Sequence, residues 1–214
     1  MTKPILYHCR DARSFRCLWA AEELGLDYEL VTMPFPPRFL VPAYKEINPL
    51  GTIPCWLDGA TKLTESAAIC QLLAHGSSIE LSPDEPDYPN YLNWLHRSDA
   101  TLTFPLAIML RYSVFPKPED RKLEIAEDYK LFFLGRAKSI EAALADGRPS
   151  LVAGRFTMAD ICIGYSIMLA LTLGLRAELG PNTLAWWERL SSRDGFRSAK
   201  ARQEESKTQA ERTS

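Results

Sequence analysis

The chain has 214 residues, of which 46% are hydrophobic and 24% are charged, proportions that are ordinary for a globular protein. Lys and Arg number 25 and Asp and Glu number 27, so the formal net charge of −2 gives no electrostatic reason to expect nucleic acid or an anionic membrane as a partner. The N-terminal residues turn polar too early for a signal peptide, and the longest apolar stretch, 161–175, is shorter than the roughly 20 residues that cross a bilayer. We therefore expect a cytoplasmic protein that does not enter membranes.

The cysteines and histidines argue against disulfide and metal chemistry. Five cysteines stand at positions 9, 17, 55, 70 and 162, no two of them with CxxC spacing, and three histidines are scattered without the spacing of metal ligands. Cys9 has two interpretations: a reactive thiol beside a loop, or a small buried residue at a strand end. We prefer the second because free cysteines are so often buried.

The first third of the chain alternates between strand and helix signals. Apolar periodicity and a hairpin signal at Asp58-Gly59 predict, in order, strand 4–8, helix 14–24, strand 28–33, strand 53–57, strand 61–64 and helix 65–74. The first three elements form a βαβ unit, which implies a parallel pair of strands. Three prolines in 34–37 predict an irregular segment.

The rest of the chain carries only helix signals after a linker. The segment 76–90 holds three prolines among acidic and small residues, a composition typical of a linker. The expected helices are 91–112 with a kink at Pro105, 119–145, 158–173 and 184–191, followed by a frayed charged tail from Lys200. Thr157 and Asp160 have capping-box spacing at the start of the third of these helices.

Several segments resemble the glutathione transferase family. Residues 48–54, Asn-Pro-Leu-Gly-Thr-Ile-Pro, followed by 63–69, Leu-Thr-Glu-Ser-Ala-Ala-Ile, are similar to the family signature. The helix at 13–26 resembles the first helix of bacterial members, and 156–161 resembles the capped core helix of their second domain. The resemblance implies an α/β thioredoxin-like glutathione-binding domain at 1–78, a linker at 79–87 and an all-helical domain at 88–205.

The resemblance also implies how glutathione, the co-substrate, is bound. A cis peptide bond before Pro54 would let the backbone of Ile53 pair with the cysteinyl part of glutathione; the alternative is an ordinary trans proline at a strand start. Ser66, at a helix N-terminus, would bind the γ-glutamyl carboxylate, and Glu65 would face the glutamyl ammonium; the alternative is a helix cap with an acidic first turn. The remaining candidates, Thr52 and Arg38, are expected near the glycyl end of glutathione. Arg38 could instead be an ordinary solvated arginine at the surface.

A transferase must also favour the thiolate of glutathione, because a free thiol has a pKa of about 8.5. The candidates are, in order of preference, Ser14 at the start of the first helix, Arg13 as a nearby cation, and Tyr7 at the end of the first strand. Ser14 has the alternative of a plain helix N-cap. Asp11 or Arg13 stands where several Ser- and Cys-type classes carry their residue, and the negative charge of Asp11 would raise the pKa of the thiol.

The resulting expectation is a homodimeric enzyme in which the glutathione thiolate attacks a small hydrophobic electrophile, by conjugation or displacement, as in detoxification. The rival from another class is a non-catalytic member of the same family that acts as a regulatory or binding protein. A thiol–disulfide reductase is disfavoured because no CxxC motif opens the first helix. The sequence does not identify the electrophile.

Overall fold

The computed structural model describes residues 3–206, which fall into two compact units. The first unit contains the residues up to Glu80 together with those from Ser191 onward, and the second is Leu81–Leu190. The domain boundaries expected from the sequence stay a prediction. By its contacts, however, the last helix belongs to the first unit, whereas the sequence grouped it with the helical domain.

A four-stranded mixed sheet forms the centre of the first unit, as expected. Its strands are β1 (Ile5–Cys9), β2 (Glu29–Met33), β3 (Cys55–Asp58) and β4 (Thr61–Leu63), in the spatial order β2-β1-β3-β4. β1 and β2 are parallel, with Tyr7 opposite Val31, while β3 runs antiparallel to both β1 and β4. Because the βαβ unit makes the parallel pair and Asp58-Gly59 makes the hairpin, the local sequence signals account for the whole sheet.

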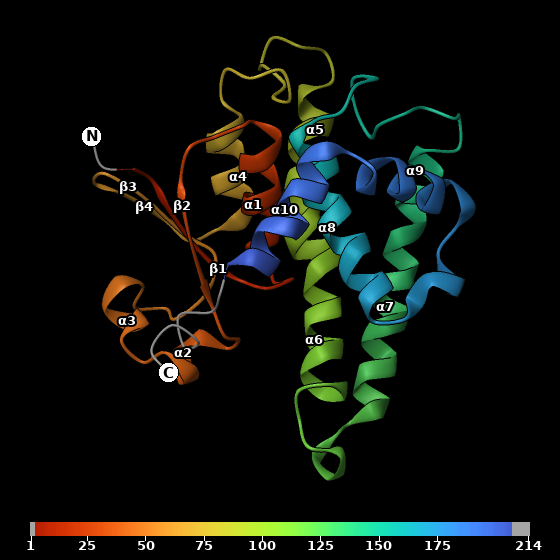
Figure 1. Ribbon diagram of the computed structural model, residues 1–214. Helices are drawn as coiled ribbons and strands as arrows, with labels where there is room; N and C mark the ends of the chain where they lie inside the picture. The colour runs from red at the N-terminus through yellow and green to blue at the C-terminus, as the bar shows by residue number, and fades with distance from the viewer. Residues whose placement is uncertain (1–2, 207–214) are drawn as a thin grey trace. The chain divides into compact units, whose positions relative to one another are not determined.

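Helices of the first unit lie on both faces of this sheet (Figure 1). They are α1 (Phe15–Glu23), α2 (Pro37–Leu40), α3 (Tyr44–Ile47), α4 (Ser66–Ala74) and α10 (Asp194–Glu205). Side chains alternate between the two faces along β1. The His8 side chain contacts residues on the side of α1 and α10, while the Tyr7 ring packs at a tilt against Tyr44 of α3, with centroids 5.5 Å apart. Cys9 belongs to the α3 side, in a cluster with Ile53 and other buried residues.

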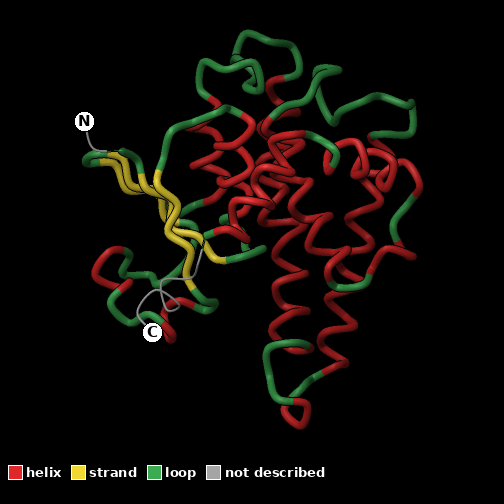
Figure 2. Tube along the Cα trace, in the orientation of Figure 1, coloured by secondary structure: helices red, strands yellow, loops and turns green. Residues whose placement is uncertain are grey.

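The second unit consists of helices (Figure 2), and no strand occurs within 81–190. Its α-helices are α5 (Tyr88–Arg97), α6 (Phe104–Ser113), α7 (Leu123–Ala143), α8 (Met158–Thr172) and α9 (Pro181–Ser191). The shorter elements are a π-helical segment, η1 (Ser98–Thr103), and two 3₁₀ turns, η2 (Pro118–Asp120) and η3 (Leu175–Glu178). The predicted interruption of the first long helix is therefore present, but it lies in the π-helical turns just before Pro105.

Helix α8 is the core of the second unit and has the predicted capping box. The Thr157 backbone N–H donates to the Asp160 carboxylate at 2.8 Å, and the N–H of Leu151 and the indole of Trp186 donate to it at 3.0 and 3.1 Å. Burial raises the pKa of Asp160 to about 6, against the opposing effect of these donors. One carboxylate thus joins the start of α8 to two other segments of the unit.

The fold class is confirmed: an α/β thioredoxin-like unit and an all-α unit. Two local expectations were wrong. Residues 200–205 belong to α10 rather than to a frayed tail, and Pro37 opens the short helix α2, because proline is well suited to a first helical turn. No helix within 3–206 is long and apolar enough to cross a membrane.

Candidate functional site

The segment between β1 and α1 carries the three residues predicted to act on the thiol. Tyr7 is partly exposed, and its pKa is raised by burial and, further, by the charges of Cys55 and Glu29. Arg13 is also partly exposed, just ahead of α1. Ser14 stands at the N-cap position of α1 and is fully buried.

The Ser14 hydroxyl bonds backward to β1 rather than forward to the first turn of α1. It lies 2.8 Å from Nδ1 of His8 and accepts a hydrogen bond from the Cys9 backbone N–H at 3.1 Å. Burial lowers the pKa of His8 to about 4, so its imidazole is neutral at physiological pH. The plain N-cap interpretation of Ser14 is therefore wrong, and the hydroxyl belongs to a buried polar network at the end of β1.

The loop before β3 is held in place by two side chains of the α3 region. The hydroxyl of Tyr44 and the amide of Asn48 both donate to the backbone carbonyl of Thr52, at 2.7 and 2.8 Å. The Ile53–Pro54 peptide bond is cis, as predicted, and so is the bond between Phe35 and Pro36, which the sequence did not reveal. The side chain of Thr52 is exposed beside this fixed carbonyl.

Gly51 brings this loop against Arg38. Its φ is +61°, in the left-handed region that favours glycine, and a Cβ added there would lie 2.6 Å from the Cβ of Arg38. The Arg38 side chain is exposed and lies over the ring of Phe39, with 4.6 Å from its guanidinium carbon to the ring centroid. The two candidates for the glycyl end, Thr52 and Arg38, are thus brought near one another by a glycine contact.

Helix α4 begins at Ser66, directly after the exposed Glu65. The Ser66 hydroxyl accepts a 2.9 Å hydrogen bond from the guanidinium of Arg16, which is fully buried within α1. The thiol of Cys17 points to the Ser66 carbonyl oxygen at 3.7 Å. Arg16 was not among the residues predicted from the sequence, although an arginine on the apolar side of the 14–24 helix was the available signal.

The candidate residues therefore occupy three neighbouring parts of the first unit. Tyr7 packs at a tilt against Tyr44, which holds the Thr52 carbonyl before β3, and Arg16 joins α1 to the N-terminus of α4. A helix N-terminus with a buried guanidinium behind its first residue is suited to a ligand that carries a carboxylate.

The cysteines take no part in this arrangement as nucleophiles. All five are buried, and burial raises the pKa of Cys9 to about 12, so its thiol stays protonated. These facts support the interpretation of Cys9 as a core residue. Across residues 3–206, no three His, Cys, Asp or Glu side chains come together as a metal site.

Comparison with known proteins supports the resemblance to glutathione transferases. A model described as the N-terminal domain of glutathione S-transferase matches residues 12–75. Glutathione S-transferase 3 of Schizosaccharomyces pombe is 34% identical over 101 residues, a match that spans 46% of this chain and 42% of that protein.

Two solved structures extend the likeness to nearly the whole chain. A glutathione transferase from Methylococcus capsulatus has a TM-score of 0.83 at 22% identity and covers 94% of this chain and 98% of its own. The theta class enzyme of Xanthomonas axonopodis pv. citri, solved with glutathione bound, has a TM-score of 0.77 at 26% identity and covers 93% and 97%. The domain match, the named relatives and the shared fold together support a member of the glutathione S-transferase family.

Proposed function

We propose that this protein is a glutathione transferase that uses glutathione as its co-substrate. The observation that carries the proposal is the pairing of Ser66, at the first position of α4, with the buried guanidinium of Arg16. A helix N-terminus already favours an anion through its unpaired N–H groups and its dipole. A buried cation directly behind the first residue adds positive charge to that same point.

In this proposal Ser66 binds the γ-glutamyl carboxylate. Because its oxygen accepts from Arg16, its own hydroxyl hydrogen is available to a ligand oxygen, and the backbone N–H groups of the first turn point the same way. Glu65, exposed beside it, faces the glutamyl ammonium. This end of the site therefore offers charge complementarity to both groups of the γ-glutamyl moiety.

The rest of glutathione follows the loop before β3. The backbone of Ile53 pairs with the cysteinyl part, and Thr52 and Arg38 lie toward the glycyl carboxylate. The hydrogen bonds from Tyr44 and Asn48 to the Thr52 carbonyl support this proposal, because they hold the loop in one conformation before any ligand arrives.

For activation of the thiol we now rank Arg13 above Tyr7 and Ser14. Ser14 is fully buried with its hydroxyl between His8 and Cys9, so donation to a sulfur requires the exchange of an existing bond. Arg13 is a partly exposed cation in the same segment, and a cation lowers the pKa of a nearby thiol. Tyr7 remains the neutral donor among the three.

The reaction is a nucleophilic attack. The ionised sulfur of glutathione forms a bond to an electrophilic carbon of a small hydrophobic substrate, and either a leaving group departs with its electron pair or the adduct takes up a proton. The protein contributes thiolate stabilisation and proximity without a covalent enzyme intermediate. Conjugation of this kind serves detoxification.

We further propose a homodimer located in the cytoplasm. Large apolar side chains on the first unit are unusually exposed, including Phe39 at 66% and Leu50 at 65%, as expected for a surface covered by a partner. None of the five cysteines forms a disulfide, which is typical of a reducing compartment. Light scattering of the purified protein in solution tests the dimer.

Turnover of a chlorodinitro-aromatic compound with glutathione tests the enzyme assignment. We expect glutathione-dependent release of chloride and retention of the protein on immobilised glutathione. Retention without turnover would favour the non-catalytic alternative, a binding or regulatory protein. Absence of both would reject the proposed function.

A further inference from the structure

Helix α10 is firmly docked within the first unit. The ring of Phe196 packs edge-on against Trp19 of α1 at a centroid distance of 4.9 Å, and Arg193 donates two hydrogen bonds to the carboxylate of Glu23 at 2.8 and 3.0 Å. A Cβ at Gly195 would lie 2.5 Å from the carboxyl carbon of Glu23, so the two helices approach at the smallest available residue.

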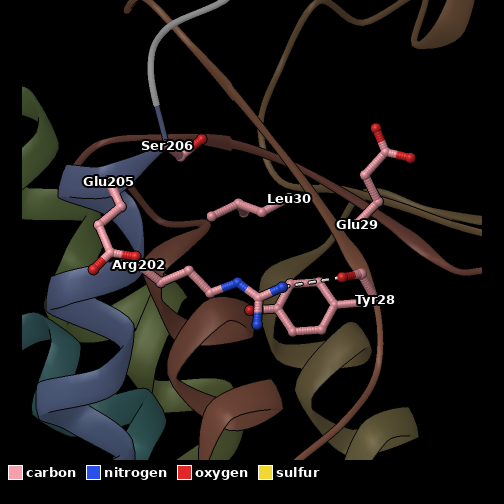
Figure 3. Close-up of a pocket in the computed structure, with 6 residues that line it drawn as sticks. All are labelled: Tyr28, Glu29, Leu30, Arg202, Glu205 and Ser206. Atoms are coloured by element: carbon pink, nitrogen blue, oxygen red, sulfur yellow. Dashed lines mark hydrogen bonds between the residues drawn. The ribbon is translucent and has the colours of Figure 1, made fainter.

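The other end of α10 is attached to the start of β2. Figure 3 shows Arg202 extending from α10 along the ring of Tyr28, and its guanidinium donates to the Tyr28 carbonyl at 3.0 Å. The same guanidinium donates to Glu22 at 2.8 Å. Arg202 and Tyr28, with Glu29, also line an open pocket of about 340 Å³ beside this attachment.

Directly after Arg202, a glutamine is fully buried. Gln203 has no exposed surface, and its amide contacts two residues near the end of β1. Its oxygen lies 3.1 Å from Nε2 of His8 and accepts from the Asp11 backbone N–H at 3.3 Å, while its nitrogen donates to the Asp11 carboxylate at 2.9 Å. The N–H and carboxylate of Asp11 therefore allow only one orientation of the Gln203 amide. The flipped amide would place its NH₂ against the Asp11 N–H and its oxygen against the Asp11 carboxylate.

The orientation of the Gln203 amide determines which ring nitrogen of His8 carries a hydrogen and where the Ser14 hydroxyl donates. Because the Gln203 oxygen can only accept, Nε2 of His8 carries the hydrogen and Nδ1 is the acceptor. The Ser14 hydroxyl then donates to Nδ1 at 2.8 Å. One side chain of α10 thus fixes both Asp11 and, through His8, the hydroxyl of Ser14.

α10 also compensates the charge of Asp11. Lys200 donates to the Asp11 carboxylate at 2.6 Å. Burial opposes ionisation of this carboxyl, but the hydrogen bonds from Lys200 and Gln203 outweigh burial and hold the pKa of Asp11 below its usual value. Asp11 also has a φ of +52°, an uncommon conformation for a residue with a side chain, which these contacts help to hold.

We propose that α10 is a positioning element of the thiol site, in which Gln203 and Lys200 hold and neutralise Asp11 and keep the segment 8–14 in one arrangement. The proposal rests on the proposed function, because it assumes that the sulfur of glutathione is bound beside this segment. Without α10, the Asp11 carboxylate would lose the Lys200 ammonium and the Gln203 amide, and its negative charge would oppose a nearby thiolate more strongly.

The first test measures the protonation of the His8 ring nitrogens in the full-length protein without glutathione. ¹⁵N NMR of the histidine side chains reports which ring nitrogen is protonated, with the exposed His75 and His96 as internal references. We expect His8 to carry its hydrogen on Nε2 in the wild type and to lose this preference in Gln203→Leu, but to keep it in Ser198→Ala, an exposed position of the same helix. An unchanged tautomer in Gln203→Leu would overturn the proposal.

The second test measures the thiol pKa of bound glutathione. In Lys200→Met, which leaves the buried amide in place, we expect the pKa of bound glutathione to rise by about half a unit or more while binding of S-methylglutathione changes less than about twofold. An unchanged thiol pKa in both Lys200→Met and Gln203→Leu would overturn the proposal. Failure of the wild type to bind glutathione would reject the proposed function instead, and the His8 tautomer would still decide whether α10 organises the segment.

Discussion

The guanidinium of Arg16 donates a 2.9 Å hydrogen bond to the hydroxyl of Ser66, although the two residues are 50 positions apart in the chain. Arg16 has no exposed surface and Ser66 is only 4% exposed. A cation so fully removed from water is costly unless its donors are satisfied, so the contact helps to fix how α1 and α4 lie together. It also places positive charge behind the helix N-terminus that we assign to the γ-glutamyl carboxylate.

A double-mutant cycle measures this relationship. Arg16→Met should weaken glutathione binding in the wild type and weaken it much less in the Ser66→Ala background, because both changes disrupt the same carboxylate site. We expect a coupling free energy of about 1–2 kcal/mol by calorimetry. Strict additivity of the two changes would show that Arg16 acts independently of Ser66, and circular dichroism serves as the folding control.

The contact of Gly51 with Arg38 predicts a specific loss of stability. Gly51→Ala adds a Cβ at a φ of +61° and 2.6 Å from another Cβ, whereas Gly59→Ala adds one at a φ of +55° with open space around it. Both variants place alanine in the left-handed backbone region, but only Gly51→Ala also creates a steric clash. The free energy of unfolding of Gly51→Ala should therefore be about 1–3 kcal/mol lower than that of Gly59→Ala. Urea denaturation compares them, and equal values would show that the loop moves aside freely.

The capping box of α8 predicts that Asp160→Asn destabilises the protein. In the asparagine an NH₂ group would replace the carboxylate oxygen that accepts from the Thr157 N–H. Two hydrogen-bond donors would then face each other at a fully buried position. We expect a loss of about 2–4 kcal/mol in the free energy of unfolding. The exposed Asp146→Asn is the control, because its pairing with Arg148 lies at the surface and should contribute less than about 1 kcal/mol. Similar losses in both variants would contradict this account of α8.

The lowered pKa of Asp11 predicts a pH dependence. Because the folded-state pKa lies below the unfolded value, the unfolded state binds more protons between the two values. The stabilisation by the ionised carboxylate is therefore present above about pH 4 and is lost as the pH falls through the folded value. The stability difference between the wild type and Asp11→Asn, measured by urea denaturation across this range, should shrink with acidification. A difference that is constant with pH would show that the carboxylate is not held by Lys200 and Gln203.

The thiol assignment is tested by the pKa of bound glutathione, followed through thiolate absorbance. Arg13→Gln should raise that pKa most, in a salt-dependent manner, because a cation acts through its charge. Tyr7→Phe removes only a phenolic donor, and Ser14→Ala removes a hydroxyl already engaged with His8, so smaller shifts are expected. A larger shift in Ser14→Ala would restore Ser14 to first place, and the largest shift in Tyr7→Phe would assign the enzyme to the Tyr-type branch.

Local sequence signals predicted most of the fold, because each depended on neighbouring residues. The βαβ order, the hairpin at Asp58-Gly59 and the capping box of Thr157 and Asp160 require only short segments, and all are present. The family resemblance correctly implied the cis bond before Pro54.

What the sequence missed depends on distant contacts. Half of the residues of α10 are charged, and its buried side includes the polar Gln203. The partners of Gln203, His8 and Asp11, lie at the other end of the chain. Arg16 is similarly charged and yet buried, because Ser66 approaches it only in the folded protein. Neither hydrophobic periodicity nor a motif could reveal these partners.

Glutathione affinity of Ser66→Ala tests the central claim most directly. Isothermal titration calorimetry should show binding by the wild type, and a loss of roughly 1.5–3 kcal/mol in the variant, because a hydrogen bond to a charged group is removed. This loss corresponds to an affinity roughly 10- to 150-fold weaker. Ser78→Ala, at an exposed position, should bind as the wild type does. Equal affinity of Ser66→Ala and the wild type would contradict the assignment of the α4 N-terminus as the γ-glutamyl carboxylate site.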